Sequence, residues 1–333
     1  MATYKNIQGF KVPTYAADPV IAQGWSVGGS MNQQRYQMGA AGTSTAAVTG
    51  MGSSPYPYLA LVEEYNGTGW TEVTNHPLAA GYASMSWCGL QTAALVAGGY
   101  HGPPGAGPWA DCFLYDGTNW STTGSMASVR SQGGLNGITS AALWAGGQAP
   151  ALLNLSEEFN GSTWAVGNTL NTARNNNVNA GSQTDAITIG GAAPGAPGTY
   201  QAEGYNGTSW VVGGIINNGR QGMQNPGGGT VGTASIVCAG NGPAATAFTE
   251  TYNGTAWTEL PAMPYATHEG GGTGPATNYL TCGGGSPVTT ATVIYSENSE
   301  PNTFLLEGQV WYNSTDGDLK FYDGSAIKTV TVS

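Results

Sequence analysis

The chain has 333 residues, of which 54 are glycine and 18 are proline, and only 8% carry a charge. So few charged residues exclude a protein built from many solvated helices and favour short strands joined by glycine turns. The net charge of −11 argues against binding to nucleic-acid phosphates. The sequence has no run of about 18 apolar residues, so we expect no membrane insertion, and it has no charged-then-apolar leader, so we expect no secretory precursor.

One motif recurs along the chain: an aromatic residue, Asn-Gly or Asp-Gly, two further residues and a tryptophan. Its copies are Tyr65 to Trp70, Tyr115 to Trp120, Phe159 to Trp164, Tyr205 to Trp210 and Tyr252 to Trp257. Trp25 lies 45 residues before Trp70 and begins the same downstream pattern, which makes six units. Because Asn-Gly and Asp-Gly tolerate positive φ, the aromatic residue should end one strand and the tryptophan begin the next.

Each unit contains two further strands between one tryptophan and the next aromatic residue. A short glycine-rich strand is followed by a strand of small residues that ends in glycines, as in Ala93–Gly99 and Ala141–Gly147. A spacing near 50 residues is typical of kelch repeats. Residues 22–298 therefore resemble a kelch-repeat, galactose-oxidase-like propeller, and the resemblance implies an all-β, six-bladed β-propeller with four strands per blade.

The two ends of the repeat region are complementary. The last unit ends at Tyr295 without a tryptophan, and the first begins at Trp25 without an aromatic-ended strand. We therefore expect residues 24–29 to complete the blade built from residues 269–297, which removes exposed sheet edges. The predicted domains are an N-terminal docking segment (1–22), the propeller (23–298) and a C-terminal β-hairpin module for docking or oligomerisation (299–333), with its turn across Thr315–Asp318 and a strand over 327–332.

The two tails carry a second resemblance. The opening Ala2-Thr-Tyr-Lys-Asn-Ile-Gln-Gly-Phe-Lys11 and the segment from Gly308 to Gly324 are similar to parts of structural proteins of tailed bacteriophages, cyanophages especially. This resemblance implies a virion component assembled in the host cytoplasm. It implies contacts with other virion proteins through residues 1–22 and 299–333, and a homo-oligomer.

Arginine and glutamate recur in the same four units. The arginines stand ten residues after a repeat tryptophan and the glutamates two residues before an aromatic residue: Arg35, Arg130, Arg174 and Arg220, with Glu63, Glu157, Glu203 and Glu250. The arginines could line a face that captures carboxylates or sulfated sugars. Their co-occurrence with the glutamates favours buried structural ion pairs between strands.

No catalytic motif, metal-ligand set or cofactor site stands out, so we expect no enzyme and no cofactor. The three histidines do not supply the two-tyrosine, two-histidine copper site of galactose oxidase, and the four separated cysteines are typical of small buried apolar residues. One set of loops gathers aromatic side chains that suit sugar rings, although such residues also pack loops: Tyr100, His101, Trp109 and Tyr200.

Three functions remain open. The first is a phage structural protein of tail, fibre or appendage type whose propeller attaches to a host-surface carbohydrate or receptor. The second is a purely architectural decoration protein of the capsid or tail. The third, which the missing catalytic residues disfavour, is a carbohydrate-active enzyme on a kelch scaffold.

Overall fold

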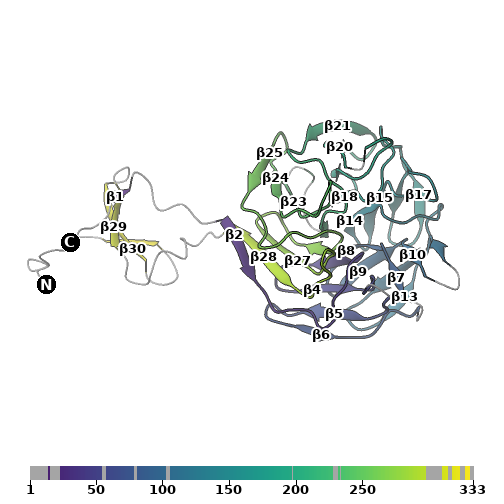
Figure 1. Cartoon of the computed structure of the whole chain (residues 1–333), viewed down its shortest axis with the longest axis horizontal. Coiled ribbons are helices and arrows are strands. Elements are labelled where there is room, and N and C mark those ends of the chain that lie inside the picture. The colour runs from purple at the N-terminus through teal and green to yellow at the C-terminus, as the bar shows by residue number, and fades with distance from the viewer. Residues whose placement is uncertain are drawn as a thin grey trace, which may run out of the picture. The chain divides into compact units, whose positions relative to one another are not determined.

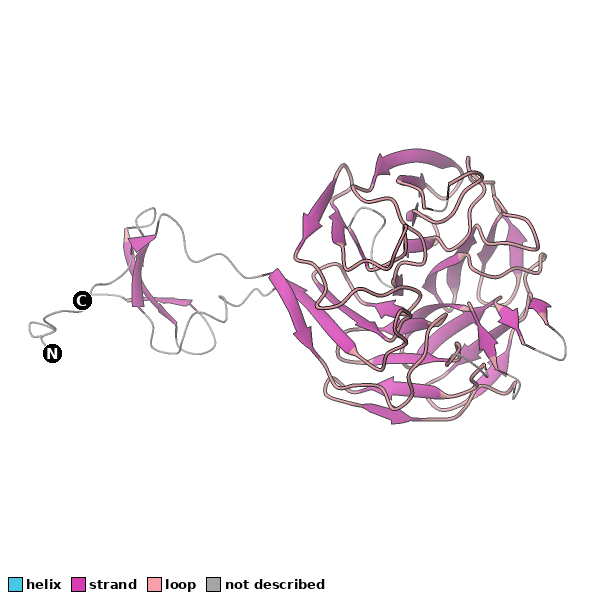
Figure 2. Ribbon diagram, in the orientation of Figure 1, coloured by secondary structure: helices cyan, strands magenta, loops and turns pink. Residues whose placement is uncertain are grey.

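A computed structural model describes residues 14–15, 23–54, 58–78, 81–102, 106–196, 198–227, 232, 234–297, 310–313, 317–322 and 327–330. These residues form strands, turns and loops without a helix, as Figure 2 shows, so the predicted all-β class is confirmed. None of them belongs to a helix long and apolar enough to cross a membrane. The chain divides into two compact units, Trp25–Tyr295 and the combination of Met1–Gly24 with Ser296–Ser333.

The larger unit consists of small antiparallel sheets that follow the sequence repeat (Figure 1). The first two repeats contain β3 (Gly39–Gly42), β4 (Ala47–Gly50), β5 (Val62–Tyr65) and β6 (Trp70–Glu72), then β8 (Ser86–Leu90), β9 (Ala93–Ala97), β12 (Cys112–Tyr115) and β13 (Trp120–Thr122). The next two contain β14 (Gly134–Ile138), β15 (Ala141–Ala145), β16 (Ser156–Phe159) and β17 (Trp164–Val166), then β18 (Val178–Gly181), β19 (Ala186–Ile189), β20 (Gln201–Tyr205) and β21 (Trp210–Ile215).

The remaining strands of this unit form two further repeat sheets and one small extra sheet. The fifth repeat holds β23 (Ser235–Cys238), β24 (Thr249–Tyr252) and β25 (Trp257–Leu260), and the closing sheet has the order β2 (Gln23–Val27), β28 (Thr292–Glu297), β27 (Asn278–Cys282), β26 (Gly271–Thr273) and β22 (Asn225–Gly227). The extra sheet contains β7 (Tyr82–Ala83), β10 (Tyr100–His101) and β11 (Gly107–Pro108).

The sheets adopt a propeller-like arrangement around a common centre (Figure 1). The first strands of successive repeats contact one another in the order β3, β8, β14, β18, β22 and β26, and β26 in turn contacts β3. Glycine permits this close approach, since a Cβ on Gly39 of β3 would lie 2.4 Å from the Trp87 ring of β8. The glycine-rich strands therefore form the crowded centre, as small residues at those positions predict.

The first strand of the larger unit pairs with its last strand. β2 lies beside β28, as expected from the two incomplete end units. The Trp25 and Tyr295 rings are 5.5 Å apart, close to the 4.9–5.1 Å of the aromatic–tryptophan pairs within the other repeats. Trp25 Nε1 donates to the Pro261 carbonyl at 2.9 Å, which connects β2 to the loop that follows β25 of the fifth repeat.

The fifth repeat departs from the predicted four strands per unit. Its first strand, β22, pairs in parallel with β26 of the closing sheet, which leaves three strands in one sheet and five in the other. Just before β22, the isolated bridges Gln221–Asn241 and Gln224–Cys238 connect the chain to the fifth repeat. Pro226 lies within β22 and has no backbone N–H to donate to a sheet ladder.

The smaller unit contains one four-stranded sheet. β29 (Val310–Asn313) pairs antiparallel with β30 (Asp318–Tyr322), and β30 pairs with β31 (Ile327–Thr329), which falls within the predicted strand over 327–332; residues 331–332 lie outside the described residues. β1 (Thr14–Tyr15) adds in parallel to β29. The tails, predicted as separate segments, thus share one sheet; the other residues of segment 1–22 and residues 299–309 lie outside the described residues.

Candidate functional site

A ring of backbone hydrogen bonds surrounds the centre of the larger unit. In each repeat, a residue two or three positions before the first strand donates its N–H to the carbonyl of its counterpart in the preceding repeat, at 2.6–3.4 Å, and the series returns to its start. All six residues have φ between 50° and 61°, a conformation that is uncommon outside glycine: Gln37, Ser84, Gln132, Asn176, Gly222 and Glu269. We call these residues the central ring.

The central ring borders two adjoining hollows. The first, the central hollow, has a volume of about 70 Å³, and among the described residues Glu269 is the one charged residue that lines it. The second, the tyrosine hollow, has a volume of about 250 Å³ and is lined by Gln37, Tyr58, Ala83, Ser84, Tyr100, Ser131, Gln132 and Gln148. Both hollows share Gln37, Ser84 and Gln132. The tyrosine hollow is therefore polar and uncharged, with two aromatic rings.

An amide network orients the side chains of the tyrosine hollow. Asn175 Nδ2 donates to Gln132 Oε1 at 2.8 Å and to Gln148 Oε1 at 2.7 Å. Both glutamine oxygens thus accept a bond from the same buried donor, and each glutamine NH₂ group stays available as a hydrogen-bond donor. Oriented amides beside an aromatic ring suit a neutral ligand with many hydroxyl groups.

The four aromatic residues predicted for a ligand-binding face do not form one cluster. Tyr100 is exposed and lines the tyrosine hollow. His101 and Trp109 pack instead against buried Tyr82, with ring centroids 5.0 and 5.8 Å away. Tyr200 is exposed but lies against Gly219 and does not line the tyrosine hollow. Of the four residues, Tyr100 alone lines the tyrosine hollow, and a role of the other three in ligand binding stays a prediction.

The amide residues of the two hollows were missed by reading the sequence. Gln37, Gln132 and Asn176 each stand two residues after a repeat arginine, and Glu269 stands two residues after Thr267, which replaces that arginine. This spacing is the signal that could have found them. Polar residues at a fixed distance from a buried anchor share a position in the fold, and here that position surrounds the centre.

The four repeat arginines are buried and paired with the glutamates of the same units. The guanidinium-to-carboxylate distances are 2.5 Å for Arg35–Glu63, 2.6 Å for Arg174–Glu203 and 2.5 Å for Arg220–Glu250, and Arg130 likewise contacts Glu157. All eight side chains are at most 1% exposed. These guanidinium groups therefore do not line a surface that could capture an anionic ligand.

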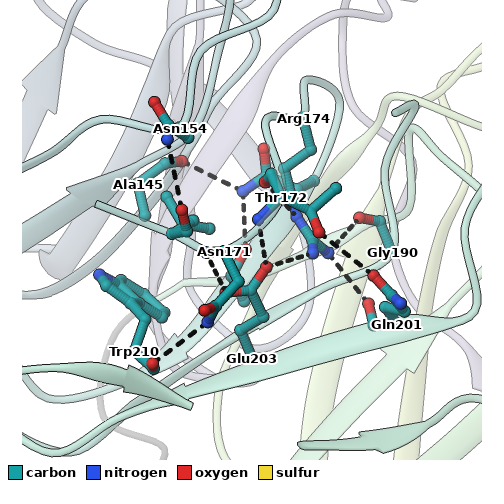
Figure 3. A network of polar contacts seen from close by, with 12 residues as sticks. Ala145, Asn154, Asn171, Thr172, Arg174, Gly190, Gln201, Glu203 and Trp210 are labelled. Carbon is teal, nitrogen blue, oxygen red and sulfur yellow. Dashed lines mark hydrogen bonds and ion pairs between the residues drawn. The ribbon is translucent and has the colours of Figure 1, made fainter. Parts of the chain in front are cut away.

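Each pair also holds the loop that leads to the central ring. Glu203 accepts from the backbone N–H of Asn171 at 2.7 Å and of Thr172 at 3.1 Å, while Arg174 Nη1 donates to the Gly190 and Gln201 carbonyls at 3.0 Å (Figure 3). Burial lowers the pKa of Arg174, and the charge of Glu203 opposes this effect. The pair thus joins the loop to the second and third strands of its own sheet.

Two repeats without the pair replace it with apolar packing. Phe113 occupies the glutamate position in the second repeat and stacks edge-on against buried His76 at 4.4 Å. Val293 occupies that position in the closing sheet and is buried. In both repeats the residue seven after the tryptophan, whose N–H would donate to the glutamate, is a proline, Pro77 or Pro264. Where no carboxylate accepts, no N–H is left unpaired at this position.

Metal-binding and redox groups are scarce in the part of the chain that the structure describes. Within the described ranges, no three His, Cys, Asp or Glu residues lie close enough to hold a metal ion. Cys88, Cys112, Cys238 and Cys282 are buried free thiols. Burial raises the pKa of Cys112 to about 12, which keeps this thiol protonated and unreactive.

No protein-family model matches the chain, and a comparison with curated proteins finds no match. Its function is therefore argued from the geometry of the central ring and the two hollows.

Proposed function

We propose that this chain is a structural protein of a phage virion, in which a six-bladed kelch-type propeller displays the tyrosine hollow for attachment to a host-surface carbohydrate. The single observation that carries the binding role is the uncharged hollow of about 250 Å³, where Tyr100 lies beside amides oriented by Asn175. A sugar ring offers an apolar face to tyrosine and hydroxyl groups to amides.

The six-bladed assignment is supported by the central ring. Six backbone hydrogen bonds return to their starting repeat, and the Trp25–Tyr295 contact repeats across the chain ends the geometry found within single repeats. A closed ring protects its sheet edges, which suits a protein exposed on a particle surface.

The virion role is supported by the resemblance of the tails to phage structural proteins and by their shared sheet. β1 and β29 pair in parallel, so the segments before and after the propeller form one unit that is available for docking to the particle and for oligomerisation. A purely architectural decoration protein would use the same unit and would leave the tyrosine hollow without a ligand.

Binding to an array of neutral and acidic glycans tests the proposed ligand class. We expect the full chain to bind neutral glycans, and Tyr100→Ala to weaken binding about 10-fold or more through loss of ring stacking. Tyr200→Ala is the matched control, because Tyr200 is also exposed but does not line the hollow. Equal weakening by both variants, or no glycan binding at all, contradicts the attachment role and leaves the decoration role.

Mass spectrometry of purified particles tests the virion role. We expect the full chain in the particles, and a chain without residues 299–333 to fold but to be missing from them. Particles that lack the full chain, or that incorporate the shortened chain equally well, contradict docking through the tails.

A further inference from the structure

The side chains of a serine, a histidine and a glutamate follow one another in space, and the glutamate lines the central hollow. Ser286 Oγ is 3.0 Å from His268 Nε2, and His268 Nδ1 is 3.6 Å from Glu269 Oε2. Ser286 is exposed, while the other two side chains are 16% and 19% exposed. This is the order of a nucleophile, a general base and a carboxylate that orients the base. The second contact is longer than a hydrogen bond, as is common in catalytic sites before a ligand binds.

The closing sheet makes room for the histidine in a way that no other repeat does. His268 bridges to Gly285, and a Cβ on Gly285 would lie 2.9 Å from His268 Cε1. The corresponding residues of the other repeats all carry a side chain: Ser53, Tyr100, Gln148, Ala192 and Asn241. The histidine and the glycine that accommodates it thus occur together, in one repeat.

The backbone of Ser286 is strained. Its φ is 65°, whereas the corresponding residues of the other repeats have no positive φ: Ser54, His101, Ala149, Ala193 and Gly242. Non-glycine residues with such a backbone conformation are strained and are concentrated at functional sites. No described residue accepts a hydrogen bond from the Ser286 N–H, so this group is available to stabilise an oxyanion, as the N–H of a nucleophilic serine does in serine proteases.

We propose that Ser286, His268 and Glu269 form a serine hydrolase site that cleaves carboxylic esters. Ser286 Oγ attacks the ester carbonyl carbon and passes its proton to His268 Nε2. The C–O bond to the alcohol breaks, and the leaving oxygen takes that proton, which leaves an acyl group on Ser286. Water then attacks the acyl carbon and gives a proton to His268, which returns it to Ser286 Oγ as the acid departs. The sum is ester plus water to acid plus alcohol.

The position of the site indicates the substrate class. Ser286 is exposed, so it can reach an ester carried by a large molecule, and Glu269 belongs to the central ring that borders both hollows. If the proposed attachment to carbohydrate holds, on which this step alone rests, the substrate is a small acyl ester on a sugar hydroxyl. The hydrolase chemistry itself does not depend on that attachment.

Labelling of the full chain with a fluorophosphonate probe tests the nucleophile. We expect a single covalent adduct that peptide mapping places on Ser286, and hydrolysis of p-nitrophenyl acetate with an initial burst. Ser54 is the matched control, because it holds the corresponding place in the first repeat and its Oγ lies 3.0 Å from Gln33 Nε2, with no histidine. Ser54→Ala should label and hydrolyse like the unmodified chain.

Variants of the other two residues test their roles. His268→Gln should lower kcat/KM for p-nitrophenyl acetate about 100-fold while the melting temperature stays within a few degrees. Glu269→Gln, which acts on His268 as a positioning residue, should lower kcat with KM unchanged. No adduct on Ser286 in the unmodified chain, or an adduct and rate that His268→Gln leaves unchanged, overturns the proposal. Because the first readout uses no variant, a folding defect cannot obscure it. Glycan binding with no labelling would contradict the hydrolase site alone.

Discussion

Replacing Arg174 by alanine removes the guanidinium that lies 2.6 Å from the fully buried Glu203 carboxylate. Breaking a buried ion pair by removing one partner costs about 3–5 kcal/mol, because a buried charge loses its compensation. Since Asn171 and Thr172 continue to donate to the carboxylate, we expect the lower half of that range. A loss of about 3–4 kcal/mol corresponds to a melting temperature lower by roughly 6–16 °C for a domain of this size.

The closing sheet supplies the matched comparison for this variant. Thr267 and Val293 occupy the arginine and glutamate positions there, so Arg174→Thr combined with Glu203→Val transplants a combination that this fold already uses. The double variant avoids an isolated charge but leaves the Asn171 N–H without its acceptor. Adding Asn171→Pro, in imitation of Pro264, removes that N–H. Asn171→Pro should therefore destabilise the unmodified chain more than it destabilises the double variant.

Urea unfolding followed by tryptophan fluorescence gives the free energies, from the midpoint and slope of each transition. We expect the double variant to lose at least about 1 kcal/mol less than the sum of the two single variants. Additive losses would refute coupling between Arg174 and Glu203. A loss below about 0.5 kcal/mol for Arg174→Ala, within the range of surface substitutions, would refute the burial of the pair.

Three other variants test separate parts of the fold. Burial lowers the pKa of His76 from its ordinary 6.5 to about 4, so as the pH falls the unfolded chain binds a proton at a higher pH than the folded chain does. The free energy of unfolding should therefore drop by about 3 kcal/mol between pH 6.5 and 4. The test is the pH dependence of the urea midpoint, which should be flatter for His76→Phe than for the unmodified chain. Removing residues 1–27 should uncover the edge of β28 and cause aggregation in light scattering, whereas removal of residues 1–22 keeps β2 and the monomer. Tyr115→Phe deletes the hydrogen bond to Glu64 Oε1 at 2.9 Å between two repeats and should cost about 1–2 kcal/mol by urea unfolding; no change would mean that this contact does not stabilise the fold.

The repeat was predictable because its signals are local. An Asn-Gly turn between an aromatic residue and tryptophan identifies the third and fourth strands, and the fixed spacing of Arg174 and Glu203 from those landmarks indicated a pair before any geometry was known. The pairing of β2 with β28 followed from two incomplete units. Each of these inferences came from a comparison of the repeat units with one another within the sequence.

Features that depend on a single departure from the repeat were not predicted. β22 joins the neighbouring sheet, and β1 joins β29 across nearly the whole length of the chain; neither pairing leaves a periodic signal. The arrangement of His268, Ser286 and Glu269 depends on Gly285 and on the positive φ of Ser286. The surroundings of the aromatic loop residues were likewise not predictable, because composition does not distinguish exposed Tyr100 from Trp109, which packs against Tyr82.

The central ring explains how one fold can carry different chemistry at its centre. The buried pair fixes the backbone at Arg174, and two residues later the N–H of Asn176 donates to the Gln132 carbonyl at 2.6 Å. The backbone position is thus determined by bonds that do not involve the side chain of the ring residue. That side chain varies among glutamine, serine, asparagine, glutamate and glycine around the ring without a change in φ. Substitutions at these positions therefore alter the polarity and charge of the two hollows at little cost to the ring, which is the freedom that a binding or hydrolytic site on a repeating scaffold needs.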